Sequence, residues 1–216
     1  PRAADVALGL ALRAYDFTEH RTGERVEPGP VAIMVAQPER MAAAAAPMAA
    51  LAEGVFFARD LVNEPSNVLT TLEFARRLDA LSALGLKVRV LDEDALDALG
   101  MRTLLAVGQG SESPSRVVVM EWTGGGDEAP LAVVGKGVVF DTGGISLKPA
   151  AGMEDMTMDM GGAGVVAGLM KTLALRKARA NVVGLVGLVE NMPDGKAQRP
   201  GDVVRTMKGD TVEVIN

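Results

Sequence analysis

Residues 131–164 read LAVVGKGVVFDTGGISLKPAAGMEDMTMDMGGAG, an apolar run that leads directly into a glycine-rich turn with charged residues. In open α/β sheets, binding sites form in this way at the carboxyl ends of the strands. Two lysines and two carboxylates stand out in this segment by residue type and spacing. They are the candidate functional residues Lys136, Asp141, Lys148 and Asp159.

The segments on either side alternate between strand-like and helix-like patterns. Apolar runs at 87–91, 116–122 and 182–189 predict strands, whereas 71–84, 93–99 and 160–177 predict helices. This alternation predicts an α/β fold in which helices cover both faces of a mixed, mostly parallel sheet, as three helix-sheet-helix layers. The aromatic content of 3% agrees, because the core must then consist of Ala, Val, Leu and Met.

The ends of the chain carry further expectations. Short apolar runs predict strands at 31–35 and 104–107, and two strands at 201–207 and 211–215, the last still running where the chain stops. Residues 1–47 cannot bury a core alone, so we predict that they are the tail of an N-terminal α/β domain and the start of a linker helix. Pro47 is expected to interrupt that helix. Residues 48–216 then form the N-terminal part of a second domain.

The overall composition excludes several classes of function. The net charge is −6 and no block of basic residues occurs, which argues against a nucleic-acid partner. No run approaches the roughly 20 uninterrupted apolar residues of a membrane span. Cysteine is absent and no basic-then-apolar leader opens the sequence, so a cytoplasmic location is expected. The single histidine, His20, is expected in a solvated loop, and one histidine excludes a multi-His zinc site.

Each of the four central residues, taken alone, also fits a structural role. Lys136 and Asp141 could form an ion pair, Asp159 could cap a helix, and Lys148 could be solvated. Together, two carboxylates and a lysine among glycines predict an oxygen-rich pocket for divalent cations. A lysine joins such a site only as a neutral amine, and an adjacent divalent charge favours loss of its proton.

Three other motifs resemble this segment, and each lacks a required part. The Asp141-Thr142-Gly143 triplet matches aspartic proteases, but it would need a second triplet and an all-β fold. The aspartate-nucleophile loop of haloacid-dehalogenase-type phosphatases needs a second acidic residue, where this chain has Gly143. A phosphate-binding P-loop needs Ser or Thr after Lys136.

Four segments, in order and spacing, resemble the leucyl aminopeptidase family, the two-metal cytosol aminopeptidases. They are LAEGVFFARDLVNEPSN (51–67), VGKGVVFDTGGISLKP (134–149), DMTMDMGGAG (155–164) and VENMPDGKAQRPGDV (189–203). The resemblance implies that residues 48–216 belong to a catalytic domain that removes the N-terminal residue of peptides, with leucine-type preference. Two divalent metal ions, Zn or Mn, would activate the attacking water.

The resemblance also implies a role for each matching residue. Lys136, Asp141 and Asp159 correspond to metal ligands, with Asp141 bridging both metals, and Lys148 to the catalytic lysine. Met156 corresponds to a residue that lines the pocket for the N-terminal side chain, although a core methionine is an equally good interpretation. Peptide substrates, a homohexamer and a bicarbonate acting as base are implied in the same way.

The family pattern continues with N-T-D-A-E-G-R, which supplies two more acidic ligands and the arginine that holds bicarbonate, whereas this sequence ends at Asn216. We therefore expect a segment of a metal-dependent aminopeptidase that is inactive alone. The alternative hypothesis is a catalytically inactive, family-derived interaction or scaffolding protein. The sequence downstream of Asn216 would distinguish the two.

Overall fold

The computed structural model describes residues 2–24 and 29–216. Within these ranges the α-helices are α1 (Arg2–Ala14), α2 (Pro38–Asn63), α3 (Thr71–Asp79), α4 (Glu93–Ala98), α5 (Arg102–Gly108) and α6 (Gly161–Leu175). The 3-10 helices are η1 (Ala80–Leu84) and η2 (Met153–Met160). The strands are β1 (Lys87–Leu91), β2 (Arg116–Thr123), β3 (Leu131–Asp141), β4 (Asn181–Asn191), β5 (Val203–Arg205) and β6 (Thr211–Glu213).

The main sheet has the strand order β1-β2-β4-β3. Strand β2 is antiparallel to both β1 and β4, and β3 is parallel to β4. Strands β5 and β6 form a separate antiparallel hairpin. The predicted mixed sheet is confirmed, but two of its three described strand pairings are antiparallel, where the sequence predicts mostly parallel ones. The parallel pairing lies between β3 and β4, the two strands that lead to the candidate site.

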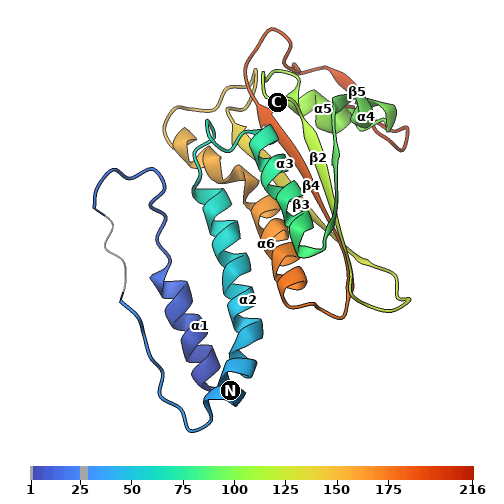
Figure 1. The fold of residues 1–216 in the computed structure, drawn as a ribbon. Helices are drawn as coiled ribbons and strands as arrows, with labels where there is room; N and C mark the ends of the chain where they lie inside the picture. The colour runs from blue at the N-terminus through green and yellow to red at the C-terminus, as the bar shows by residue number, and fades with distance from the viewer. Residues whose placement is uncertain (1, 25–28) are drawn as a thin grey trace.

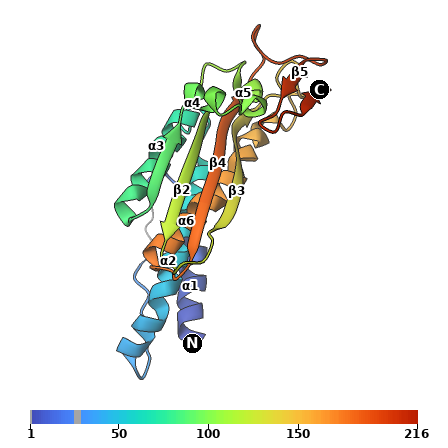
Figure 2. The same ribbon diagram turned by 90° about the vertical axis from the view of Figure 1, so that its right-hand side faces the viewer.

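Helices cover both faces of the sheet, which confirms the three-layer α/β fold (Figures 1 and 2). On one face, α2, α3 and α6 bury apolar side chains against residues such as Val118 and Val186. On the other face, α4 and α5 pack against the alternate residues Val117, Val119 and Leu185. Because successive side chains of a strand point to opposite faces, β2 and β4 are apolar on both. Helix α1 and the first half of α2 project beyond the ends of the strands (Figure 2).

Helix α2 continues through Pro47, so the predicted interruption is wrong. Proline removes one backbone donor, and the carbonyl left without it belongs to Ala43, which is exposed and accessible to water. By length and composition α2 could also cross a membrane, since an 18-residue window has a mean hydropathy of 1.6. Alanine accounts for much of this value, and α2 packs here against α1 and α6.

Three of the predicted strands differ from the structure. Residues 104–107 lie in α5, because their apolar side chains pack on Leu96 and Val117 from outside the sheet. Residues 31–35 have no regular structure, and Val31 and Met34 are exposed, with no neighbouring strand to pair with among the described residues. The last strand ends at Glu213, so it does not run to the end of the chain. Part of the turn-rich segment 15–30 lies outside the described residues.

The N-terminal segment is attached to the end of α2 by polar contacts. The Tyr15 hydroxyl donates to Asp60 at 2.8 Å, and His20 Nε2 lies 2.9 Å from Glu64 Oε2. Glu64 is buried and also accepts a hydrogen bond from Arg77. His20 is exposed in a turn, as the sequence predicts, and its ring also contacts the buried Glu64 carboxylate.

Helices α2 and α6 cross closely at Gly54 and Gly168, which leads to a prediction about stability. A Cβ atom at Gly54 would overlap Thr172 Oγ1 and the Gly168 carbonyl oxygen, a backbone atom that cannot turn away. We expect Gly54→Ala to destabilise the intact protein, because overpacking costs about 1–3 kcal/mol. The gain in helix propensity, about 1 kcal/mol, offsets only part of this cost. Urea denaturation measures the free energy of unfolding.

Gly9→Ala in α1 is the matched control. A Cβ atom at Gly9 would meet no described residue within 4 Å. Gly9→Ala should therefore raise the free energy of unfolding through the higher helix propensity of alanine, without any steric cost. Equal stabilities of the two variants would show that the helix crossing tolerates a methyl group and would contradict the prediction.

Candidate metal centre

A β-bulge brings Lys136 and Asp141 to the same face of the sheet. Residues five apart on a regular strand point to opposite faces. Lys136 pairs with Gly187 and Asp141 with Asn191, and the register shifts by one residue between Val138 and Asp141. Because 187 and 191 lie on one face of β4, their partners Lys136 and Asp141 also share a face. Bulges of this kind often redirect side chains beside active sites.

Lys136 forms an ion pair with Asp159. Its Nζ atom lies 2.5 Å from Asp159 Oδ1. Asp159 belongs to η2, which packs along β3. The second oxygen, Asp159 Oδ2, is buried and makes no hydrogen bond with any described residue. A buried carboxylate oxygen without a partner is costly unless something else binds it, so this oxygen is available to a cation.

The Asp141 carboxylate forms an ion pair with one lysine and accepts hydrogen bonds from two further groups. Lys148 Nζ approaches its Oδ2 at 2.5 Å, and Oδ1 accepts hydrogen bonds from Gly143 N and Asn191 Nδ2, both at 2.8 Å. Burial raises the pKa of Asp141, but the hydrogen bonds from Lys148, Gly143 and Asn191 together hold that pKa below its usual value. The carboxylate is therefore kept ionised, as a metal ligand must be.

The turn after β3 returns Lys148 to Asp141. Gly143 and Gly144 have φ angles of +91° and +66°, in the left-handed region that glycine adopts without strain. The loop closes where Lys148 N donates to the Thr142 carbonyl at 2.9 Å. Lys148 Nζ also lies 3.2 Å from the Asp141 carbonyl oxygen. The glycines of the motif thus position the lysine ammonium directly beside the carboxylate.

Met156 lies next to the same lysine. Its sulfur atom is 3.5 Å from Lys148 Nζ, and its side chain is half-buried in η2. Since Asp159 follows in the same 3-10 helix, η2 contacts both ion pairs. The sequence predicts all five of these residues as site residues. The structure pairs Lys136 with Asp159 and Asp141 with Lys148, and it places Met156 against Lys148.

The donor set fits divalent cations, although it has no cluster of the usual ligands. Within the described residues no three His, Cys, Asp or Glu side chains group together. Each of the two carboxylates instead pairs with a lysine ammonium group. The unpartnered Asp159 Oδ2 and the ionised Asp141 carboxylate are hard oxygen donors of the kind that divalent cations prefer. Lys136 can add a nitrogen once it loses its proton.

Sequence reasoning missed Asn191 and the bulge. Asn191 lies within the segment 189–203, but its amide type gave no reason to single it out. Its position opposite Asp141 depends on the register between two strands, which no local pattern specifies. The predicted strand ended at residue 189, so Asn191 fell just beyond it, whereas β4 continues to Asn191 in the structure.

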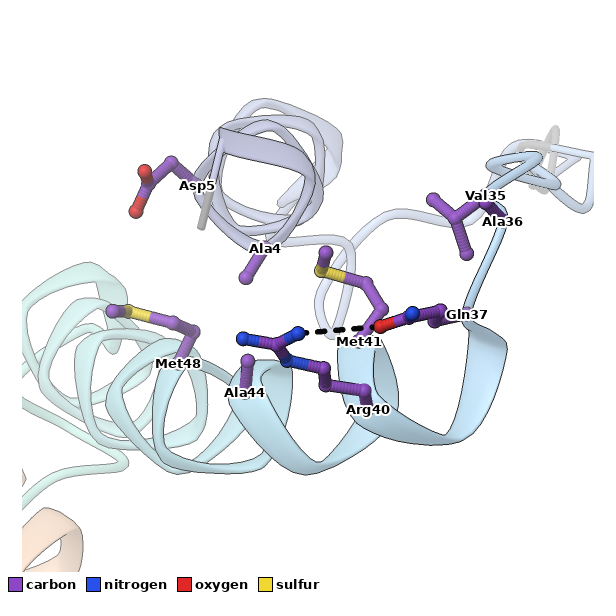
Figure 3. A pocket seen from close by; sticks show the side chains of 9 residues that line it. All are labelled: Ala4, Asp5, Val35, Ala36, Gln37, Arg40, Met41, Ala44 and Met48. Carbon is purple, nitrogen blue, oxygen red and sulfur yellow. Dashed lines mark hydrogen bonds between the residues drawn. The ribbon is translucent and has the colours of Figure 1, made fainter.

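Two cavities lie away from these residues. A pocket of about 570 Å³ opens between α1 and the start of α2, where Met41 and Met48 face Ala4, and Arg40 donates to Gln37 (Figure 3). An apolar groove of about 490 Å³ lies between α2 and α6. None of the five candidate site residues lines either cavity.

The model of the catalytic domain of the cytosol aminopeptidase family matches residues 56–216. The chain belongs to this family. The match covers β3, η2 and β4, so every candidate site residue lies inside it. The resemblance seen in the sequence is confirmed.

Relatives within the cytosol aminopeptidase family match the whole chain. A probable cytosol aminopeptidase of Cereibacter sphaeroides is 74% identical over 216 residues, which are 100% of this chain and 44% of that protein. One from Dinoroseobacter shibae is 68% identical over 215 residues, with the same coverage. The chain thus spans less than half the length of these curated relatives.

A solved structure shares the fold. The bottromycin maturation enzyme BotP in complex with Mn superposes with a TM-score of 0.86 and 41% sequence identity. The match covers 98% of this chain and 45% of the BotP chain. The described arrangement of helices and strands is therefore that of a known family structure.

Proposed function

We propose that this chain forms part of a metal-dependent aminopeptidase that hydrolyses the N-terminal residue of peptides, with a preference for leucine-type residues. Family membership supports aminopeptidase chemistry. Because the chain spans only 44% of its curated relatives, the activity belongs to the intact protein. Peptide substrates, a homohexamer and a cytoplasmic location complete the proposal and rest on the family alone.

Lys136, Asp141 and Asp159 are the proposed metal ligands. Two divalent cations, Zn or Mn, when bound, polarise a carbonyl oxygen and make a water molecule more acidic. The BotP structure is a complex with Mn, which supports a divalent ion in this chain as well. The two carboxylates of this chain would supply negative charge, and Lys136 would supply a nitrogen ligand in place of its ion pair with Asp159. The bicarbonate implied by the family resemblance remains a prediction.

Lys148 and Met156 are proposed to act on the substrate. An ammonium group fixed beside Asp141 can stabilise the negative charge that develops on a peptide carbonyl oxygen, and one such donor is worth on the order of 3 kcal/mol. Met156, in contact with Lys148 at 3.5 Å, can line the pocket for the N-terminal side chain. Its flexible thioether adapts to apolar side chains of different shape.

The observation that carries this proposal is the buried Asp159 Oδ2, which has no hydrogen-bond partner among the described residues, beside the Lys136 amine. The test is metal removal from the intact protein. Dialysis against a chelator should abolish hydrolysis of leucine p-nitroanilide, and added Mn or Zn should restore it. N-acetyl-leucine p-nitroanilide, which has no free amine, is the control and should not react. Full activity after chelation would contradict the proposal.

A further inference from the structure

Asn191 is the residue of β4 that lies opposite Asp141. Its Nδ2 atom donates to Asp141 Oδ1 at 2.8 Å. Without the bulge in β3, the residue opposite Asn191 would be Phe140, two positions after Val138. The extra residue in β3 therefore places Asp141, and not an apolar side chain, beside the Asn191 carboxamide.

The turn after β3 is built around this carboxamide. The Asn191 carbonyl accepts hydrogen bonds from Thr142 N at 2.9 Å and Thr142 Oγ1 at 2.8 Å, which fixes its backbone. At Gly144 a Cβ atom would lie 2.8 Å from Asn191 Oδ1, so only glycine leaves the amide enough room. The backbone contacts do not need the side chain. Within the described residues, the Asn191 side chain makes its hydrogen bond to Asp141 alone.

The charge of the Asp141 carboxylate determines which end of the Asn191 carboxamide faces it. An ionised carboxylate only accepts hydrogen bonds, so the NH₂ end of Asn191 must face it. Gly143 N and Asn191 Nδ2 together occupy the two acceptor positions of Oδ1. These two hydrogen bonds restrain rotation of the carboxylate, and Oδ2 faces Lys148 at 2.5 Å.

We propose that Asn191 is a positioning residue that orients Asp141 for metal binding, an inference that rests on the proposed function. Groups that hydrogen-bond to a metal ligand fix its orientation, and their loss typically weakens metal binding by about 10–100-fold. Asn191 acts through Asp141 and does not itself bind metal or substrate.

The test is Mn affinity of the intact protein, measured by competition with a fluorescent chelator. Asn191→Ala should weaken Mn binding by about 10–100-fold. Asn191→Leu, which keeps the volume but has no donor, should behave in the same way and guards against misfolding of one variant. Asp141→Ala is the reference for loss of the ligand itself.

Asn181→Ala is the matched control, at the other end of β4. The Asn181 side chain hydrogen-bonds to Gly125, Gly126 and Glu128 but to no site residue. It should keep wild-type Mn affinity. The melting temperature of the metal-free Asn191→Ala protein should fall no further than that of Asn181→Ala, because Asn191 loses fewer hydrogen bonds.

The outcomes separate the two proposals. Unchanged Mn affinity in both Asn191 variants, with affinity lost in Asp141→Ala, would overturn the positioning role and leave the proposed function intact. Unchanged affinity in Asp141→Ala would overturn the proposed function and the positioning role with it. Equal losses of affinity in Asn191→Ala and Asn181→Ala would indicate a general effect of β4 stability and would also overturn the positioning role.

Discussion

Asp141→Ala in the intact protein is expected to reduce hydrolysis of leucyl amides to the background rate. Asp141 is the proposed ligand on which Lys148, Gly143 and Asn191 all converge, and its carboxylate is kept ionised by them. A hydrogen-bond partner of a ligand contributes about 10–100-fold to affinity or activity, so loss of the ligand itself should exceed that factor. Steady-state turnover of leucine p-nitroanilide, with bound metal counted by elemental analysis, measures both effects.

Asp141→Asn distinguishes charge from shape. The amide has nearly the same volume and can still face Lys148, but it cannot neutralise a cation. We expect it to lose activity almost as fully as Asp141→Ala. Asp97→Ala is the matched control, because Asp97 is an exposed carboxylate in an ion pair with Arg102, away from the site. Turnover of Asp141→Ala at the level of Asp97→Ala would refute the assignment of Asp141 as a ligand.

The sequence predicts which side chains of the candidate site lie close together, because the segments that carry them are near one another in the chain. Lys136 ends up beside Asp159 since β3 and the segment after it fold back within a short stretch. The glycines at 143 and 144 have the positive φ angles that a tight turn after a strand requires. In these places residue type and spacing determine the geometry directly.

The remaining features depend on contacts between distant segments. The bulge that places Lys136 and Asp141 on one face is defined by the pairing of β3 with β4, whose register shifts between Val138 and Asp141. Residues 104–107 fit a short strand and a short helix equally well by pattern, and packing against Leu96 and Val117 decides for the helix. The antiparallel pairing of β2 with β4 is likewise a contact between distant segments, and the periodicity of either strand does not predict it.

Lys148→Ala is expected to lower kcat for leucyl amides by about 100- to 1,000-fold, the usual cost of removing one donor to a developing oxyanion. Lys148 Nζ is held by the carbonyl and carboxylate oxygens of Asp141 and by the sulfur of Met156, so its position is fixed before substrate binds. Metal content should fall much less than kcat, because Gly143 and Asn191 still hold the Asp141 carboxylate. Turnover per bound metal is the deciding measurement.

Lys148→Arg tests whether charge alone is sufficient, and Lys87→Ala is the matched control. Arginine keeps the charge but presents a planar fork in place of a compact ammonium group, so it should restore only part of the activity. Lys87 is an exposed lysine on β1 that pairs with Glu121, and Lys87→Ala should be as active as wild type. If Lys148→Ala loses its metal but turns over normally per metal that remains, then Lys148 serves to hold Asp141 and does not act on the substrate.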